Sequence, residues 1–501
     1  MLLQAAGTLA LMRKAGYQPA IAPEPELAPA PPELLPVVGP KGTDHLHQML
    51  VNSLHLELLP DYLTRLAGRD LLVPPALLVP LLRHATRSTE TRAVLGPVLG
   101  ARGHWLASLN PEWVKLADKV AATGQVETGI STWETGTTPQ RLAWLTQHFT
   151  QAPDEARALL LAALPAEPAK MQEALLDILA HHLHPDAEPT LEALLKARGQ
   201  EVRRRAAELL AQIPGAALTE RLWARAAPLI RARRKLLGLG KPALDIILPT
   251  AWDKSWLLDG IEEITGRFEY RISTTVGLQT TLGPAAGRLG NLVGLLPPSR
   301  WTAHLDLTPG ELLAAALASE WALPLLPSWA HSTLLHRDTA FASAFLKLWQ
   351  EELPALEKAN CARGIDWGLL AALLPTAEQR TLLLAPTIER VRRQHDDWAL
   401  GLSFVPAPWP RALSAAVLET IARKLTKTAV LYEHNAPPYN LRQLAWLLPQ
   451  TVAPSLAPAD AAWAIQQVEA IEQVHSVFQP QLHTFVDTLR FQADLESSLN
   501  E

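Results

Sequence analysis

Two groups of residues in this 501-residue sequence are of types that can bind a metal or act in catalysis. In the first, His181 and His184 lie three residues apart at the end of a predicted helix, and Asp186 follows. Imidazole nitrogens and a carboxylate are common ligands of transition metals. The alternative is that the histidines end a helix whose dipole favours positive charge there. Because no second ligand group lies nearby in the sequence, we favour the helix-end interpretation and expect no metal and no cofactor.

The second group centres on Cys361, the one cysteine of the chain. A nucleophilic thiol needs a base and a group that orients it, and neither is identifiable beside Cys361, so we expect an inert or buried thiol. The segment Gly283–Arg288, GPAAGR, resembles a phosphate-binding loop, but its glycine spacing is one residue short and no Lys-Ser/Thr follows. We therefore predict that the protein is not an enzyme, with a metal-assisted enzyme at His181 and His184 as the weakest alternative.

A third group of residues is basic and suits binding of an anion. Between Lys196 and Lys241 the sequence carries 12 Lys and Arg against three Glu, although the whole chain has a net charge of −5. Such asymmetry is typical of contact with a polyanion. The candidate side chains are those of Arg203, Arg204, Arg231, Arg233, Arg234 and Lys235.

The basic residues also have a purely structural interpretation. Within QEVRRRAAELL, Glu201 and Arg205 are four residues apart, as are Arg204 and Glu208, so both pairs can form ion pairs within one helix. Only Arg203 lacks such a partner, and the RARRK segment from Arg231 has no acidic neighbour within helical reach. We favour a solvated face or a surface for an acidic protein over nucleic acid, because Trp223 is the one aromatic residue in the window.

The elements that must position these residues are predicted to be short helices. Apolar residues recur three and four apart in most of the chain, whereas alternating strand-like patterns are scarce. The predicted buried stripes include Leu142, Leu145 and Phe149; Leu175, Ile178, Leu179 and Leu183; and Phe341, Phe345, Leu348 and Trp349. Many of the 42 prolines separate these runs and are expected to begin or end helices.

Two segments interrupt the helical pattern. Residues 18–43 contain PAIAPEPELAPAPPELLPVVGP and are predicted to form an extended proline-rich linker, with a docking peptide as the alternative. Residues 237–300 are rich in Gly and Pro, include the best strand candidate, EYRISTTVGL, and are predicted to connect two helical halves. The expected organisation is thus an N-terminal helix over 1–17, that linker, helical repeats over 44–236, the connection, and a C-terminal helical segment over 301–501.

The composition bears on the compartment. A single cysteine excludes an internal disulfide and suits a reducing cytoplasm. The most apolar stretch, LLVPPALLVPLL, has 12 residues with three prolines, whereas a membrane-spanning helix needs about 20 apolar residues. We therefore expect a cytoplasmic protein with no membrane partner.

The clearest repeat unit lies around the arginine triplet. Val202, Ala206, Leu209, Leu210 and Ile213 form one apolar helix face, which Pro214-Gly215 terminates, and a shorter amphipathic helix ends just before it at Gly199. Such a helix pair resembles a HEAT-type repeat, which buries its apolar face only by stacking on neighbours. The predicted fold class is an all-α, HEAT-like α-solenoid in two segments.

Several motifs resemble those of a bacterial family, domain of unknown function 5691. The segment VLGARGHWLASLNPEW is similar to its Gly-Xaa-Arg-Gly-Xaa-Trp-Leu and Asn-Pro-Xaa-Trp pattern, through Gly100, Arg102, Gly103, Trp105, Leu106, Asn110, Pro111 and Trp113. WETGTTPQRLAWL, EVRRRAAELLAQIPGAALTERL, RLGNLVGLLPPSRW and APWPRALSAAVL resemble further family segments in the same order. Trp105 and Trp113 suit ring packing over a helix corner, with a ligand-stacking site as the alternative.

The resemblance implies no activity. It does imply partners, because genes of the family tend to lie near those for AAA-type ATPases, von Willebrand factor A proteins and SWIM zinc-finger proteins. Together with the expected solenoid, this predicts a non-catalytic scaffold or adaptor that binds proteins, presenting residues such as Arg203 and Arg204 on its concave surface. Nucleic-acid binding through residues 196–241 is the first alternative.

Overall fold

The structure is a computed structural model that describes residues 2–16, 29–110, 112–113, 130–233, 241–261, 283–393, 398–432, 435–437, 439–471 and 474–499. It is predominantly helical, as the apolar spacing predicts. The predicted stripes are largely confirmed: Leu145, Phe149, Leu175, Leu179 and all four residues of the Phe341–Trp349 stripe are buried. Leu142, Ile178 and Leu183 are partly buried and pack against the same core. Among the described helices, none is long and apolar enough to cross a bilayer.

The first half of the chain forms two groups of helices. The N-terminal ones are α1 (Leu2–Lys14), α2 (Pro40–Leu50), α3 (Leu59–Ala67), α4 (Leu78–Ala85), α5 (Thr89–Val94) and α6 (Gly96–Leu109). The next are α8 (Ile130–Thr135), α9 (Thr138–Gln151), α10 (Pro153–Ala163), α11 (Ala169–His181), α12 (Glu188–Leu194), α13 (Gln200–Gln212) and α14 (Ala217–Ala226). The α1 side chains are solvent-exposed wherever their burial is described.

A two-stranded antiparallel ribbon of β1 (Ile230–Arg233) and β2 (Ala243–Ile246) introduces the second half. Its helices begin with α15 (Lys254–Leu258), α17 (Pro284–Leu295), α18 (Pro298–Leu305), α19 (Pro309–Leu317), α20 (Ala322–Leu335) and α21 (Thr339–Lys358). They end with α22 (Trp367–Ala372), α23 (Thr376–Arg392), α24 (Arg411–Leu431), α25 (Tyr439–Leu447), α26 (Ala453–Ser455), α27 (Ala461–Glu469) and α28 (Gln479–Ser498).

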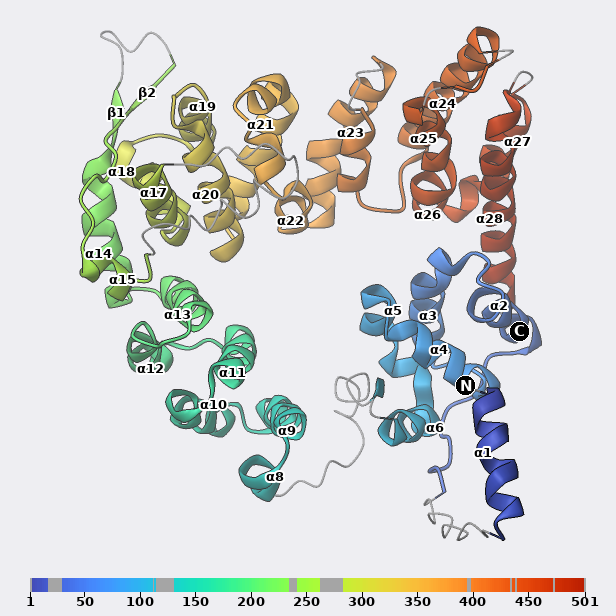
Figure 1. The fold of residues 1–501 in the computed structure, drawn as a ribbon. Coiled ribbons are helices and arrows are strands. Elements are labelled where there is room, and N and C mark those ends of the chain that lie inside the picture. The colour runs from blue at the N-terminus through green and yellow to red at the C-terminus, as the bar shows by residue number, and fades with distance from the viewer. Residues whose placement is uncertain are drawn as a thin grey trace.

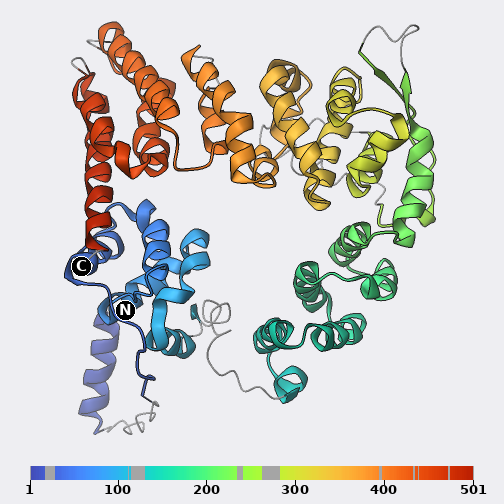
Figure 2. The same cartoon turned by 180° about the vertical axis from the view of Figure 1, so that it is seen from behind.

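Successive helices lie side by side along a wide arc. Helices α8 to α14 form one limb, and α17 to α28 continue around until the last helix lies beside α2 (Figures 1 and 2). Prolines begin several of these helices, among them α2, α10, α17, α18 and α19. Proline suits this position because its missing N–H would be unpaired there in any case.

The predicted linker is shorter than the sequence suggests. Helix α2 begins at Pro40 rather than at residue 44, because Pro40 is itself the first helical residue and Gly39 is the cap. Residues 29–39 form no helix, and residues 17–28 lie outside the described part of the chain. The predicted strand EYRISTTVGL also lies outside the described residues.

The Gly/Pro-rich centre is not a simple connection between two halves. Every residue of α17 from Ala286 to Leu295 is buried, and Arg288 donates hydrogen bonds to the carbonyl oxygens of Pro249 (3.0 Å) and Thr250 (3.1 Å). The glycines of α17 are three and four residues apart and therefore share one helix face, where small residues suit a helix that is enclosed on all sides. One core cluster runs through this region, from Trp133 to Leu489.

The boundary between cores lies elsewhere. A second cluster comprises buried residues of the segment from Val38 to Trp113, together with Leu495 and Leu499 from the opposite end of the chain. Helix α28 therefore supplies part of the core of the N-terminal helices. In Figure 1 the lower end of this red helix meets the blue α2.

Polar contacts reinforce this junction of the two chain ends. The buried His45 imidazole lies 3.0 Å from the Asp494 carboxylate, and the hydroxyls of Tyr62 and Ser498 are 3.0 Å apart in a buried hydrogen bond. The ring of Phe491 stacks on His55 with centroids 4.6 Å apart. These contacts specify how α28 meets the N-terminal helices, because a buried polar pair requires correct alignment.

The junction generates a stability prediction. We expect Leu495→Ala to lower the free energy of unfolding by about 2–5 kcal/mol, the usual cost of a buried Leu→Ala cavity. We also expect faster hydrogen exchange in α2–α4, whose core the side chain completes. The matched control is Leu109→Ala, since Leu109 is 44% exposed in the same N-terminal unit. Equal effects of the two substitutions in denaturant titration and in hydrogen exchange would contradict the shared core.

Candidate functional site

The arginine triplet lies on α13 and is used within the fold. Arg204 forms ion pairs with Glu201 and, at 2.8 Å, with Glu208. Arg205 pairs with Glu201 at 3.1 Å and also with Asp177 of α11. Both predicted pairs four residues apart are therefore confirmed. The hydrogen bonds that Arg204 donates to the Glu201 carboxylate raise the pKa of its guanidinium further above the ordinary value.

Arg203, which has no partner at helical spacing, bonds to backbone instead. Its Nη1 donates to the carbonyl oxygens of Ala197 (2.9 Å) and Arg198 (3.0 Å), which follow the end of α12. These carbonyl groups belong to the connection between α12 and α13, and a guanidinium has enough N–H donors to bond to both. The predicted apolar face is also confirmed, since Val202, Ala206, Leu209, Leu210 and Ile213 are all buried.

Two further arginines of the basic window pair with acids from other parts of the sequence. Arg221 pairs with Glu192 (3.0 Å) and with Asp259 (2.8 Å), and Arg225 also reaches Asp259 at 3.0 Å. Asp259 is only 4% exposed, so its charge requires these partners. The Arg225 guanidinium also lies over the ring of Trp256, 4.8 Å from the centroid. A charge count over one sequence window therefore misses acidic residues outside the window that lie close to it in the folded protein.

The RARRK segment is partly a strand, and its expected isolation from acids is wrong. Arg231 lies opposite Asp245 in the β1–β2 ribbon, and Arg233 Nε is 3.4 Å from the Asp245 carboxylate. The expectation assumed helical reach, whereas a strand brings its neighbours from the facing strand. Arg233 remains 67% exposed at its side chain. Arg234 and Lys235 lie outside the described residues.

The histidine cluster is organised around an ion pair. Asp186 receives a hydrogen bond from Arg157 at 2.9 Å, and His184 Nδ1 lies 3.1 Å from the same carboxylate. Slight burial raises the pKa of Asp186, but the bonds from Arg157 and His184 outweigh it and leave that pKa below its ordinary value. His181 is the exposed last residue of α11. Within the described ranges, no three or more His, Cys, Asp or Glu residues are grouped so that they could hold a metal ion.

Cys361 is fully buried at the end of α21 and is a free thiol. Its Sγ donates to the carbonyl oxygen of Ala359 at 3.4 Å. Burial raises the pKa of this thiol to about 12. Since the thiolate is the reactive form, the structure agrees with the prediction of an inert thiol.

The Gly-Xaa-Arg-Gly-Xaa-Trp-Leu segment forms a kinked helix that is capped from a distance. Within α6, Gly100 has φ 63° and ψ −179°, a conformation that breaks the helix in two. The break exposes the backbone N–H groups of Ala101 and Arg102, which donate to the Glu33 carboxylate at 2.8 and 2.9 Å. Glu33 belongs to the proline-rich segment, so one carboxylate caps the second half of α6 and fastens that segment to it.

The remaining motif residues complete the same corner. Gly103 is buried within α6, while Trp105 is half-buried. Asn110 Oδ1 accepts a hydrogen bond from the Glu112 N–H (2.9 Å), and Trp113 is buried in the N-terminal core. Pro111 lies outside the described residues. These contacts give Gly100 a structural role within α6, and Asn110 and Trp113 a structural role just after its end.

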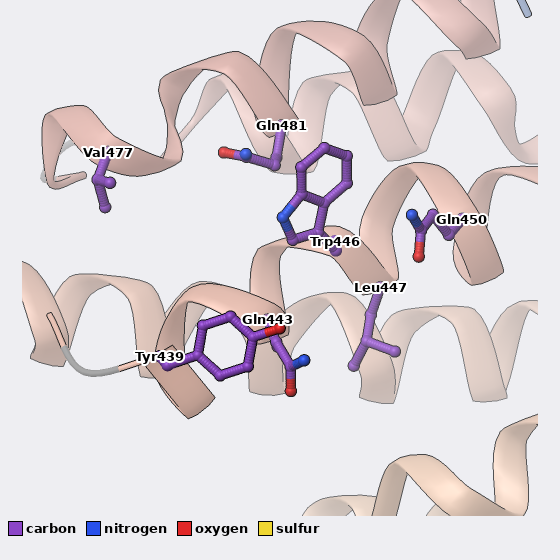
Figure 3. A pocket seen from close by; sticks show the side chains of 7 residues that line it. All are labelled: Tyr439, Gln443, Trp446, Leu447, Gln450, Val477 and Gln481. Atoms are coloured by element: carbon purple, nitrogen blue, oxygen red, sulfur yellow. The ribbon is translucent and has the colours of Figure 1, made fainter.

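A groove that sequence analysis did not single out lies beside α25. It encloses about 590 Å³ and is lined by Tyr439, Gln443, Trp446, Leu447, Gln450, Val477 and Gln481. In Figure 3, Trp446 lies between Gln481 on one side and Tyr439 and Gln443 on the other. Tyr439 and Trp446 are 68% and 46% exposed, unusually open for aromatic side chains. The available sequence signal was a stripe of Tyr, Gln, Trp and Gln spaced four, three and four residues apart.

The fold and these sites together define a large, predominantly helical protein whose conspicuous charged residues are largely engaged in internal contacts. The model of a family of unknown function, DUF5691, matches residues 1–499. The chain therefore belongs to this family, as the motif resemblance predicted. No curated protein matches the chain.

The α6 kink generates a prediction with an internal control. In Gly100→Ala the new Cβ would overlap Glu33 Oε2 and lie 2.7 Å from Leu72 Cδ1. We expect the free energy of unfolding to fall by about 1–3 kcal/mol because this backbone conformation suits only glycine. The overlap should lower it by a further ~1–3 kcal/mol. In Gly215→Ala, φ is also positive (+76°) but nothing lies within 4 Å of the new Cβ. If denaturant titrations show the Gly215 variant to be as destabilised as the Gly100 variant, the capping contact is unimportant.

The Cys361 thiol generates a reactivity prediction. In the native protein we expect a thiol-specific disulfide reagent to modify no cysteine at pH 8, because the group is buried and its pKa is about 12. In denaturant, one equivalent should react rapidly, since an unfolded cysteine has a pKa of about 8.5. Rapid modification of the native protein, measured by absorbance of the released thiol, would exclude the buried environment.

Proposed function

We propose that this protein is a non-catalytic scaffold or adaptor that binds other proteins, built as a HEAT-like α-solenoid. The observation that carries the proposal is the single core cluster that runs from Trp133 to Leu489 through successive helices. Helix α13 packs against α11, α12 and α14, and the succession continues through α17, α20 and α21 to α23 and α24. In such an array each apolar stripe is covered by the next unit, which leaves a long surface for partners.

The contacts of the candidate charged side chains support a scaffold better than the alternatives. Arg203, Arg204, Arg221 and Arg225 are engaged in internal contacts, which reduces the support for nucleic-acid binding through residues 196–241. Asp186 is engaged by Arg157, which reduces the support for a metal-assisted enzyme. Of the predicted contact residues, this leaves the exposed Arg231 and Arg233 of β1 as better candidates than Arg203 and Arg204.

The partner and the compartment are part of the proposal. An AAA-type ATPase or a von Willebrand factor A protein is the partner class that the family resemblance implies. A cytoplasmic location suits the single buried free thiol, because a reducing compartment favours unpaired cysteine.

Affinity purification from the native host tests this function. We expect specific proteins to co-purify with the wild-type chain, and to remain bound after nuclease treatment, because protein contacts do not depend on nucleic acid. A matched variant, Arg231→Glu with Arg233→Glu, reverses the exposed charge of β1 without removing a buried group. Recovery of the chain alone under several growth conditions would contradict the scaffold. Nuclease-sensitive recovery, or a low-salt gel shift that the double variant abolishes, would favour nucleic acid instead.

A further inference from the structure

The groove beside α25 combines exposed aromatic rings with hydrogen-bonding groups. Helix α25, which carries Tyr439 and Trp446, contacts α24, whose last residues Val430 and Leu431 are each 65% exposed. Adjacent large apolar side chains in water are typical of a contact surface rather than of an inert one. Within the described part of the chain, the indole nitrogen of Trp446 and the amides of Gln443 and Gln450 have no hydrogen-bond partner.

The far wall of the groove is held in place by its own contacts. Gln481 comes from the start of α28 and Val477 from the 3-10 turn just before it, and both elements pack against α25. With the Gln481 amide turned so that its nitrogen is the donor, it donates to the carbonyl oxygens of Val477 (3.1 Å) and Phe478 (3.2 Å). A wall fixed in this way is organised before any partner arrives, which lowers the entropic cost of binding.

The lining restricts the chemistry of the occupant. None of the seven lining residues is charged, so an acidic or basic segment would lose hydration without gaining a counter-charge. The open amides and the indole N–H need partners from the occupant's backbone. A bound helix would satisfy its own backbone groups internally, whereas a polyproline II segment makes no internal hydrogen bonds and leaves its carbonyl groups free.

The spacing of the aromatic residues also matches such a segment. Tyr439 and Trp446 are seven residues apart within α25, which places them roughly 10 Å apart along the helix axis. A polyproline II helix repeats after three residues, or about 9 Å. Proline rings one turn apart can therefore meet Tyr439 and Trp446 together, while Gln443 lies between the two aromatic residues and can donate a hydrogen bond to a carbonyl oxygen of the segment.

We propose that the groove formed by α25 and the start of α28 binds an extended, uncharged, proline-rich segment of a partner protein. Proline rings pack on Tyr439 and Trp446, and segment carbonyls accept hydrogen bonds from Trp446 Nε1 and from the amides of Gln443 and Gln450. This inference rests on the proposed scaffold function and names the kind of partner sequence that it recognises. Aromatic-lined grooves recognise this conformation because it is already extended before binding.

Fluorescence anisotropy of a labelled oligoproline peptide with the full-length protein tests the groove. We expect saturable binding, and a loss of affinity of about tenfold or more in Trp446→Ala and in Tyr439→Ala, as for aromatic anchors at other interfaces. Trp446→Phe keeps a ring but loses the donor and should lie between wild type and Trp446→Ala. The matched control is Leu258→Ala, since Leu258 is 47% exposed on α15 and should leave binding unchanged.

Each other outcome has a defined meaning. Absence of oligoproline binding, or binding that neither aromatic variant weakens, overturns the proposal. A neutral disaccharide that binds in place of the peptide, and whose affinity falls in Trp446→Ala, makes this a sugar site and also overturns it. If affinity purification recovers the same partners with wild type and Trp446→Ala, the scaffold stands while the groove assignment fails. If the peptide binds but affinity purification recovers no partner, the groove assignment stands while the scaffold function fails.

Discussion

The arrangement of this protein depends on one helix that belongs to two hydrophobic cores. Phe485 and Leu489 of α28 are buried in the large cluster that extends back to Trp133. Leu495, less than two turns further along, and Leu499 are buried among the N-terminal helices. A helix is stiff over this length, so the two cores cannot reorient independently without exposing apolar surface on one of them. The N-terminal helices and the end of α28 are thereby held together.

The ion pairs, like the shared core, join residues that are far apart in the sequence. Acids that pair with arginines of the basic window come from α11, α12 and the residue after α15, and Asp259 contacts both Arg221 and Arg225. These contacts link helices that are distant in sequence, and in the exposed pairs each adds only a modest amount to stability. Their main effect is on specificity, because an unpaired Asp259 would be costly to bury.

Sequence reasoning succeeded where structure is local and failed where it is not. The helices, the α13 face and the pairs of Glu201 with Arg205 and Arg204 with Glu208 follow from spacing within one turn or two. The glycine-rich α17 was mistaken for part of a connection, because glycine density resembles a loop unless the helix is known to be enclosed. The junction of Leu495 with the N-terminal core joins residues hundreds of positions apart, and no local pattern reports it. The groove was missed because exposure of Tyr439 and Trp446 depends on which neighbours the fold supplies.

The motif that carries the family resemblance has a structural role in this protein. Gly100 turns the backbone so that two N–H groups converge on Glu33, which is the geometry of an anion site at a helix N-terminus. Here the chain provides the anion itself. Consequently the proline-rich segment is fastened at Glu33, and Val38 continues the attachment through a backbone hydrogen bond to Leu72. Residues of this motif therefore hold the segment that precedes α2 against α6.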